Sequence, residues 1–239
     1  MNSGEICNLL NVYSPVDVRW KHGVNSQADL SDAFDSPSSK QVNFIECDVG
    51  ITKQGMIHLC HYPNESESDL SLRDMLVRWS SFIKPKGLKI DLKRSDLIQS
   101  VIEEILSVPI TGYPLWINAD VFGSNKKMDL KELEPFLQCP QINGFSLGIL
   151  GNEFELLTHL ESIIDQTDSL FSNFHVTYAI NANVGVYLLD QVKKLIAKPN
   201  RSITFWTAKN ESVSQEMADS LASLGNIFMD VQKFQSPSL

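Results

Sequence analysis

The chain has 239 residues, of which 43% are hydrophobic and 21% are charged, and its mean hydropathy is -0.10. This composition is that of a soluble globular protein with a sizeable core, and the length fits either one (β/α)8 barrel or two small domains. The formal net charge is -9, the sequence pI is about 5.0 and no basic cluster is able to neutralise a row of phosphates. These values exclude nucleic acid as an expected partner, because a row of phosphates needs a matching row of cations.

The ends and the cysteines give no sign of export. The amino terminus contains Glu5 and has no basic residues before a long apolar stretch, so it does not resemble a secretory signal. No run approaches the roughly 18 consecutive apolar residues of a membrane span, and we expect no transmembrane segment. We therefore expect a cytoplasmic or otherwise intracellular protein, or a secreted one if a signal has been removed. The cysteines lack metal-ligand spacing and form no disulfide framework; they are Cys7, Cys47, Cys60 and Cys139.

Short β-rich runs alternate with helical patterns along the chain. We expect strands at 18–22, 42–49, 87–93, 115–120, 144–147, 175–180, 203–207 and 227–231. We expect helices at 27–34, 71–81, 95–107, 130–137, 153–166, 184–196 and 213–224. One additional strand, at 56–60, follows a tight turn at Lys53-Gln54-Gly55.

This alternation is typical of βαβ units and a parallel sheet. Eight strands and about as many connectors favour a single TIM-type (β/α)8 barrel with an extra hairpin strand after the second barrel strand. A doubly wound open sheet could use the same alternation. Since no linker or repeat divides the chain, we expect one domain over residues 1–239, with residues 16–231 as the barrel proper.

Polar side chains recur on one face of several expected strands. In the strand at 87–93, three apolar residues alternate with Lys89, Asp91 and Lys93, and successive strand residues point to opposite faces. The apolar face should meet the helices, so the charged face should point into the barrel. Other strands contribute Glu46, Asp48, Asn118, Asp120 and Asn181. A solvated face would explain any one strand, but several together indicate a site, because buried charges are costly unless they are paired or bind a metal.

The carboxylates of this set have the pattern of a cation site. Glu46 and Asp48 lie two residues apart on one strand and offer oxygen ligands on one face, and Asp91 on the next barrel strand completes a triad. Three carboxylates repel one another unless a cation or protons compensate. We expect one divalent cation, Mg²⁺ or Ca²⁺, since oxygen ligands suit these ions better than zinc. Lys93 would supply positive charge for a phosphate.

An ordered set of motifs covers the first 93 residues. It consists of His22-Gly23, Glu46-Cys47-Asp48, Thr52-Lys53-Gln54-Gly55, His61 and Lys89-Ile90-Asp91-Leu92-Lys93. This set resembles the glycerophosphodiester phosphodiesterase and phospholipase-C-like barrel superfamily. The resemblance implies metal-dependent hydrolysis of a small phosphodiester or a lysophospholipid-type head group, with His22 and His61 as the acid–base pair.

Longer segments are similar to the menorin family, in its short form without a membrane anchor. They are Trp20-Lys21-His22-Gly23-Val24-Asn25-Ser26, residues 86–93, residues 114–120, Gly144-Phe145-Ser146-Leu147-Gly148 and Thr204-Phe205-Trp206-Thr207. Extracellular members of this family are associated with cell-surface adhesion complexes. The resemblance therefore also implies an alternative: a catalytically weak or inactive binding or adhesion module with a protein partner.

Three positions depart from the diesterase pattern, and one of them is Asp91, where Glu is commoner. Gly23 replaces the usual Arg after the first His, and Tyr62 replaces the usual Asp after the second. Taken singly, either histidine of the pair could be structural, and only the order of the motifs favours a catalytic role. Substrate-binding candidates are Asn25, Lys89, Asn118, Asp120, Asn181 and Trp206, of which Trp206 also suits a barrel-filling position.

Overall fold

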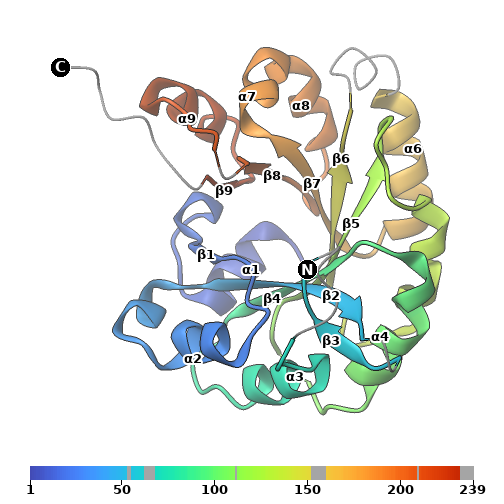
Figure 1. The fold of residues 1–239 in the computed structure, drawn as a ribbon. Coiled ribbons are helices and arrows are strands. Elements are labelled where there is room, and N and C mark those ends of the chain that lie inside the picture. Colours follow the sequence, from blue (N-terminus) through green and yellow to red (C-terminus); the bar gives the residue numbers. More distant parts are fainter. Residues whose placement is uncertain (53–54, 62–67, 111, 152–159, 209, 232–239) are drawn as a thin grey trace. The chain divides into compact units, whose positions relative to one another are not determined.

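The computed structural model describes residues 1–52, 55–61, 68–110, 112–151, 160–208 and 210–231 (Figure 1). Parallel strands follow the order β1-β2-β4-β5-β6-β7-β8-β9, and β3 pairs with β2 in an antiparallel hairpin. Parallel strands in chain order, joined by helical connections, define a TIM-type (β/α) barrel. The expected fold class, including the extra hairpin strand, is therefore confirmed.

The chain consists of two compact units. The first contains Arg19–Asp120 and Lys127–Gly144, and we call it the β1–β5 unit. The second contains Met1–Val18, Val121–Lys126 and Phe145–Leu239, and we call it the β6–β9 unit.

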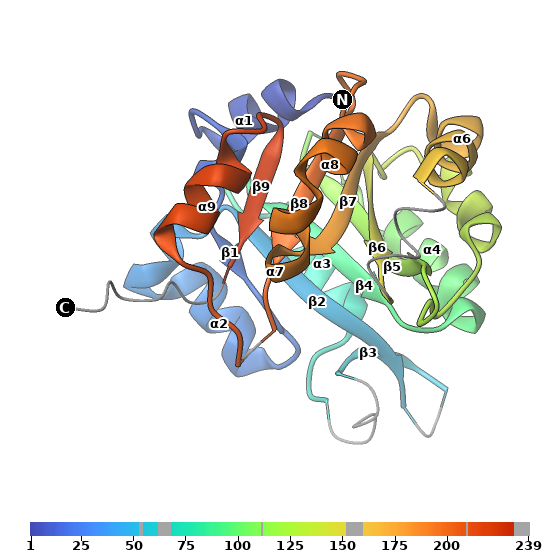
Figure 2. The ribbon, with the colours of Figure 1, turned by 90° about the horizontal axis from the view of Figure 1, so that it is seen from above.

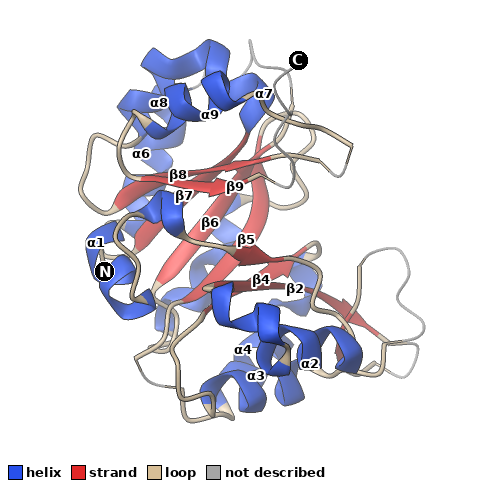
Figure 3. Ribbon diagram, turned by 90° about the vertical axis from the view of Figure 1, so that its left-hand side faces the viewer, coloured by secondary structure: helices blue, strands red, loops and turns tan. Residues whose placement is uncertain are grey.

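The strands of the β1–β5 unit are β1 (Trp20–Lys21), β2 (Phe44–Ile51), β3 (Ile57–Leu59), β4 (Gly87–Leu92) and β5 (Leu115–Phe122). Its helices are α2 (Gln27–Asp35), α3 (Leu72–Ser80) and α4 (Ile98–Leu106), with 3₁₀ helices η2 (Pro37–Gln41), η3 (Ser95–Leu97) and η4 (Leu130–Gln138). Helices α2, α3 and α4 lie on one side of β2 and β4 (Figure 3). Strand β3 lies beside the carboxyl end of β2 (Figure 2).

The β6–β9 unit contains β6 (Gly144–Ile149), β7 (His175–Asn181), β8 (Arg201–Trp206) and β9 (Ile227–Asp230). Its helices are α1 (Ser3–Leu10), α6 (Leu160–Phe171), α7 (Ala182–Gly185), α8 (Leu189–Leu195) and α9 (Gln215–Ala222), with 3₁₀ helices η1 (Pro15–Asp17) and η5 (Val186–Leu188). The helix expected at 153–166 lies partly outside the described residues, and its described part extends to Phe171. In the described part of the chain, no helix combines the length and the apolar character that a membrane crossing requires.

Short polar side chains fix the starts of several helices. The hydroxyls of Ser26 and Ser71 accept hydrogen bonds of 3.1 Å from the backbone N–H groups of Asp29 and Asp74, at the first turns of α2 and α3. Each bond satisfies one of the amide groups that a helix start leaves without a partner. These caps explain why the boundaries expected for α2 and α3 agree closely with the structure, whereas the helix expected at 184–196 is divided into α7, η5 and α8 and the one expected at 130–137 is the 3₁₀ helix η4.

Strand β4 shows the expected division into two faces. Its apolar residues Leu88, Ile90 and Leu92 are completely buried. The register places Lys89 opposite Glu46 and Asp91 opposite Asp48 on β2, so the charged residues of the two strands share a face. The predicted parity of this strand is confirmed, and one face of β2 and β4 carries the polar groups.

Candidate functional site

Two rows of side chains cross the paired strands β2, β4 and β5. The first row consists of Glu46, Lys89 and Trp116, and the second consists of Asp48, Asp91 and Asn118. Since residues two apart on a strand point to the same side, both rows lie on one face. The register alone therefore brings three acids, a lysine and an amide together.

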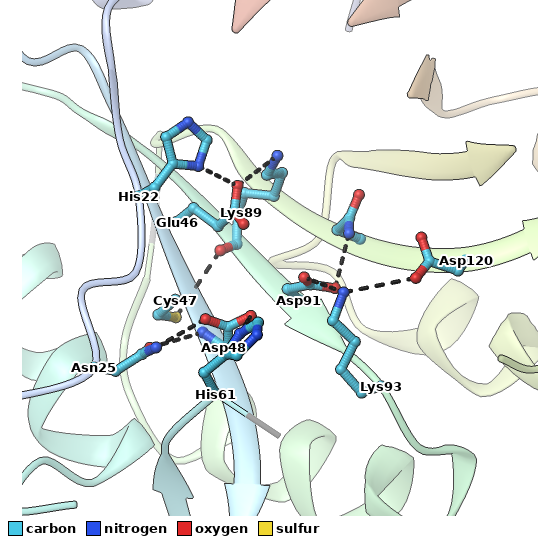
Figure 4. A network of polar contacts seen from close by, with 11 residues as sticks. His22, Asn25, Glu46, Cys47, Asp48, His61, Lys89, Asp91, Lys93 and Asp120 are labelled. Atoms are coloured by element: carbon cyan, nitrogen blue, oxygen red, sulfur yellow. Dashed lines mark hydrogen bonds and ion pairs between the residues drawn. The ribbon is translucent and has the colours of Figure 1, made fainter. Parts of the chain in front are cut away.

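Glu46 is held by two basic groups in the first row. Its Oε2 atom lies 2.7 Å from Nζ of Lys89 and 3.0 Å from Nδ1 of His22 (Figure 4). The Lys89 ammonium also lies 4.7 Å from the centre of the Trp20 ring, a cation–π contact. Burial would raise the pKa of Glu46, but Lys89 and His22 outweigh it and hold that pKa well below its usual range. Glu46 therefore stays ionised beside a buried cation.

Asp91 lies in the second row and is buried. It accepts a hydrogen bond of 2.8 Å from Nδ2 of Asn118, and its Oδ2 atom lies 2.7 Å from Nζ of Lys93 (Figure 4). Burial raises the pKa of Asp91 to about 6. Lys93 acts to lower this pKa, and the carboxylates of Glu46 and Asp48 act to raise it. Burial would lower the pKa of Lys93, but Asp91 and Asp120 raise it above its usual range, and Asp120 lies 3.6 Å from Nζ. Lys93 therefore remains a cation.

Asp48 is fixed by an amide and approached by a histidine. Nδ2 of Asn25 donates to Oδ2 of Asp48 at 2.8 Å, and the backbone N–H of Asp48 donates to Oδ1 of Asn25 at 2.9 Å. Nδ1 of His61 lies 3.4 Å from Oδ1 of Asp48, and the His61 side chain is 71% exposed. Asp48 is thus rigidly placed, whereas His61 faces solvent.

The turn after β1 explains one departure from the diesterase pattern. Gly23 has a φ of +61°, a conformation that residues with a side chain rarely adopt. The next N–H group, of Val24, donates to the carbonyl oxygen of Glu46 at 2.9 Å, and this bond brings the following Asn25 close to Asp48. Glycine at this position therefore serves the placement of Asn25. Tyr62, a second departure from the diesterase pattern, lies outside the described residues.

The three carboxylates have a spacing that suits one hard cation. Oxygen atoms of Glu46, Asp48 and Asp91 all lie within 4.8 Å of one another. Oxygens on opposite sides of one ion are separated by about 4.2 Å for Mg²⁺ and by up to about 5 Å for Ca²⁺. Asp48 and Asp91 are buried and Glu46 is half-buried, so the set is also largely shielded from water. These residues could hold a divalent ion without a large rearrangement.

A hollow of about 490 Å³ lies beside the second row. It is lined by His61, Lys93, Arg94, Asp120 and Lys127. Sequence reasoning missed two of these residues, Arg94 and Lys127. Arg94 could have been found from its position directly after Lys93 at the carboxyl end of a strand, whereas Lys127 follows a loop and belongs to no periodic pattern.

Asn181 and Trp206 belong to the β6–β9 unit, and the other expected site residues belong to the β1–β5 unit. These two residues occupy paired positions at the ends of β7 and β8, and both are half-buried. Nδ2 of Asn181 donates to Oε2 of Glu211 at 2.7 Å, so this amide is already engaged within its own unit.

Comparison with protein families gives a match to the menorin N-terminal domain over residues 15–145, which is more than half of the 239 residues. A comparison with curated proteins finds no match. The matched range includes the three carboxylates, both lysines that neutralise them and the two histidines of the predicted acid–base pair. The chain therefore belongs to the menorin family.

Proposed function

We propose that the β1–β5 unit carries a metal-assisted phosphodiesterase site in which Glu46, Asp48 and Asp91 hold one Mg²⁺ or Ca²⁺ ion. The observation that carries the proposal is the convergence of these three carboxylates within 4.8 Å of one another. Lys89 and Lys93 neutralise only two of the three negative charges. The set therefore keeps one excess negative charge with which to attract a cation.

The charge balance also supports an anionic substrate. A divalent ion would offset the excess negative charge of these carboxylates, Asp120 included, and the bound ion would itself attract a phosphodiester monoanion. When bound, the ion would polarise the phosphoryl oxygens. Lys93 borders both the carboxylates and the hollow, so its ammonium is suited to stabilising negative charge that develops on those oxygens.

Proton transfer is assigned to the two histidines. An oxygen nucleophile, either water or a substrate hydroxyl, forms a bond to phosphorus while the bond from phosphorus to the leaving alcohol oxygen breaks. One histidine accepts the proton of the nucleophile and the other donates a proton to the leaving oxygen. His22 is oriented by Glu46 at 3.0 Å, and His61 lies 3.4 Å from Asp48. Water would yield a phosphomonoester, and a substrate hydroxyl would yield a cyclic phosphate.

This proposal places the chain within the glycerophosphodiester phosphodiesterase and phospholipase-C-like barrel superfamily. Its substrates would be small phosphodiesters or lysophospholipid-type head groups. Support comes from the strand order of a TIM-type barrel and from Asp91 and Lys93, which lie at the carboxyl end of β4, the end at which such barrels place their catalytic groups.

One observation favours a second function. Glu46 is already paired with Lys89, and Asp91 is already paired with Lys93, so most of the charge in the set is balanced without an ion. A catalytically inactive member of the menorin family that binds a protein partner would need no more than this. The alternative is therefore a binding or adhesion module that keeps the barrel and its hollow.

Hydrolysis assays separate the two functions. The full chain would be incubated with glycerophosphodiesters and lysophospholipids, with Mg²⁺, with Ca²⁺ and with a chelator. If the chain is a diesterase, turnover should need the cation and should be suppressed in His22→Ala. The control His58→Gln should keep turnover, because His58 lies outside the site and contacts the backbone oxygen of Ser68. Absence of turnover on every substrate with either ion would reject the diesterase proposal.

A further inference from the structure

The hollow beside the carboxylates has an unusual charge for this protein. The chain as a whole has a formal net charge of -9. Among the residues that the structure describes, the lining of the hollow nevertheless contains Lys93, Arg94 and Lys127, together with His61, and one carboxylate, that of Asp120. A concave region with this lining attracts anions, because its low-dielectric walls concentrate the field of its charges.

The three permanent cations are not equally engaged. Lys93 pairs with Asp91 and Asp120. Arg94 forms a two-point contact with Asp96, at 3.0 and 2.7 Å, and the Asp96 side chain is 60% exposed. Lys127 is exposed and forms no ion pair with any side chain that the structure describes. The positive charge of Lys127 is therefore available to an anion in the hollow, in addition to the charge of Lys93 that the proposed reaction uses.

A backbone contact fixes the position of Lys127, and the end of β4 gives the position of Arg94. The N–H group of Lys127 donates to the carbonyl oxygen of Asp120 at 2.8 Å, which anchors its main chain beside the last residue of the polar face on β5. Arg94 follows Lys93 directly after the end of β4. The main chain of both residues therefore lies next to the proposed reaction centre.

We propose that Lys127 and Arg94 form an anion subsite that accepts a second anionic group of the substrate. The inference rests on the proposed function for the reacting phosphodiester and adds the substrate class, which is a phosphodiester bearing a further phosphate or carboxylate. A hollow of about 490 Å³ is large enough for such a head group. The Asp96 carboxylate is 60% exposed, so water can solvate it when Arg94 turns toward the hollow, and the planar guanidinium can then bind two oxygens of the anion.

The test compares two probes that differ by one phosphomonoester, glycerophosphoinositol and glycerophosphoinositol 4-phosphate. Their affinities for the full chain would be measured by titration calorimetry in buffer without divalent cations, so that turnover does not consume them. We expect the 4-phosphate to bind about fivefold more tightly or better, and the difference to shrink at high KCl. The double variant Lys127→Gln/Arg94→Gln should reduce the difference to about twofold or less.

The matched control is Lys131→Gln/Arg73→Gln, which removes the same two charges from exposed residues outside this hollow: Lys131 lines a different hollow, and Arg73 pairs with Glu104 at 2.9 Å. This variant should keep the full difference between the probes. Equal affinities in the wild type, or a difference that survives the double substitution, would overturn the subsite. Hydrolysis of the two probes is measured separately with Mg²⁺ or Ca²⁺. A difference in affinity without turnover supports the subsite and rejects the diesterase. Turnover of both probes with equal affinities rejects only the subsite.

Discussion

Asp48 and Asp91 occupy directly paired positions on the parallel strands β2 and β4, and both side chains are buried. Oxygen atoms of the two side chains lie within 4.8 Å of each other. At this distance the negative charge of one carboxylate raises the proton affinity of the other, unless a cation neutralises the pair. Burial raises the pKa of Asp91 to about 6, and the negative charge of Asp48 adds to the effect. The pairing of Asp91 with Lys93 offsets part of this repulsion, and a divalent ion at the proposed site would offset more of it.

Removing one partner of the buried ion pair between Glu46 and Lys89 should be costly. Lys89→Met removes the cation and leaves Glu46 with His22 as its remaining basic neighbour. Since an uncompensated buried charge is costly, we expect the free energy of unfolding to fall by about 3 kcal/mol, measured by urea denaturation at pH 7.

A double substitution identifies the cause of that loss. Glu46→Gln/Lys89→Met leaves no unpaired charge at this position, so its loss of stability should be smaller than the sum of the two single losses. Additive losses would contradict the assignment of Lys89 as the partner that balances Glu46.

Much of this fold is readable from local pattern. Leu88, Ile90 and Leu92 alternate with charged residues, and this period of two correctly predicts both the strand and its faces. The serine caps Ser26 and Ser71 likewise mark the starts of α2 and α3. Such signals are local, so one sequence contains them in full.

The missed features have two different causes. Helix α1 has a clear start signal, because Asn2 and Glu5 form reciprocal capping bonds, but its short length gives little periodic pattern. The ion pair of Lys89 with Glu46 depends on the register between two strands, and the place of Lys127 depends on a loop closing onto Asp120. Periodicity shows which face a residue occupies but not which residue lies beside it.

Packing at the start of β4 leaves no room for a side chain at Gly87. This residue pairs with Phe44 on β2, and a Cβ atom at Gly87 would lie 2.2 Å from the Phe44 ring. Gly87→Ala should therefore lower the free energy of unfolding by about 1–3 kcal/mol through overpacking. In the Phe44→Leu background the same substitution should cost less, and an equal cost in both backgrounds, measured by urea denaturation, would show that the ring is not the obstacle.

His175 should weaken the protein in acid. It is fully buried in β7, its Nε2 atom lies 2.9 Å from Oγ of Ser202, and burial lowers the pKa of His175 to about 3. The unfolded chain takes up a proton at about pH 6.5, whereas the folded chain does so only near pH 3. The free energy of unfolding is therefore unaffected by this residue above about pH 6.5. Below that pH it falls by at most about 1.4 kcal/mol per pH unit, because the unfolded chain binds the proton and the folded chain does not.

The matching variant is His175→Gln, which keeps a polar group for Ser202 but cannot gain a proton. Urea denaturation at several pH values between 4 and 7 should give this variant a shallower loss of stability than the wild type, by up to about one proton's slope. Parallel pH profiles for the two proteins would show that His175 does not carry the effect.

The most direct test of the carboxylate site is titration calorimetry of the full chain with MgCl₂ and CaCl₂. Asp91→Asn keeps the side-chain size and an oxygen that can accept from Asn118, but it removes one charge from the three-carboxylate set. We predict that the wild type and the exposed control Asp190→Asn bind one ion per chain, and that Asp91→Asn folds but binds it about tenfold more weakly or worse. A wild type that binds neither ion, or an Asp91→Asn variant with unchanged affinity, would contradict the site.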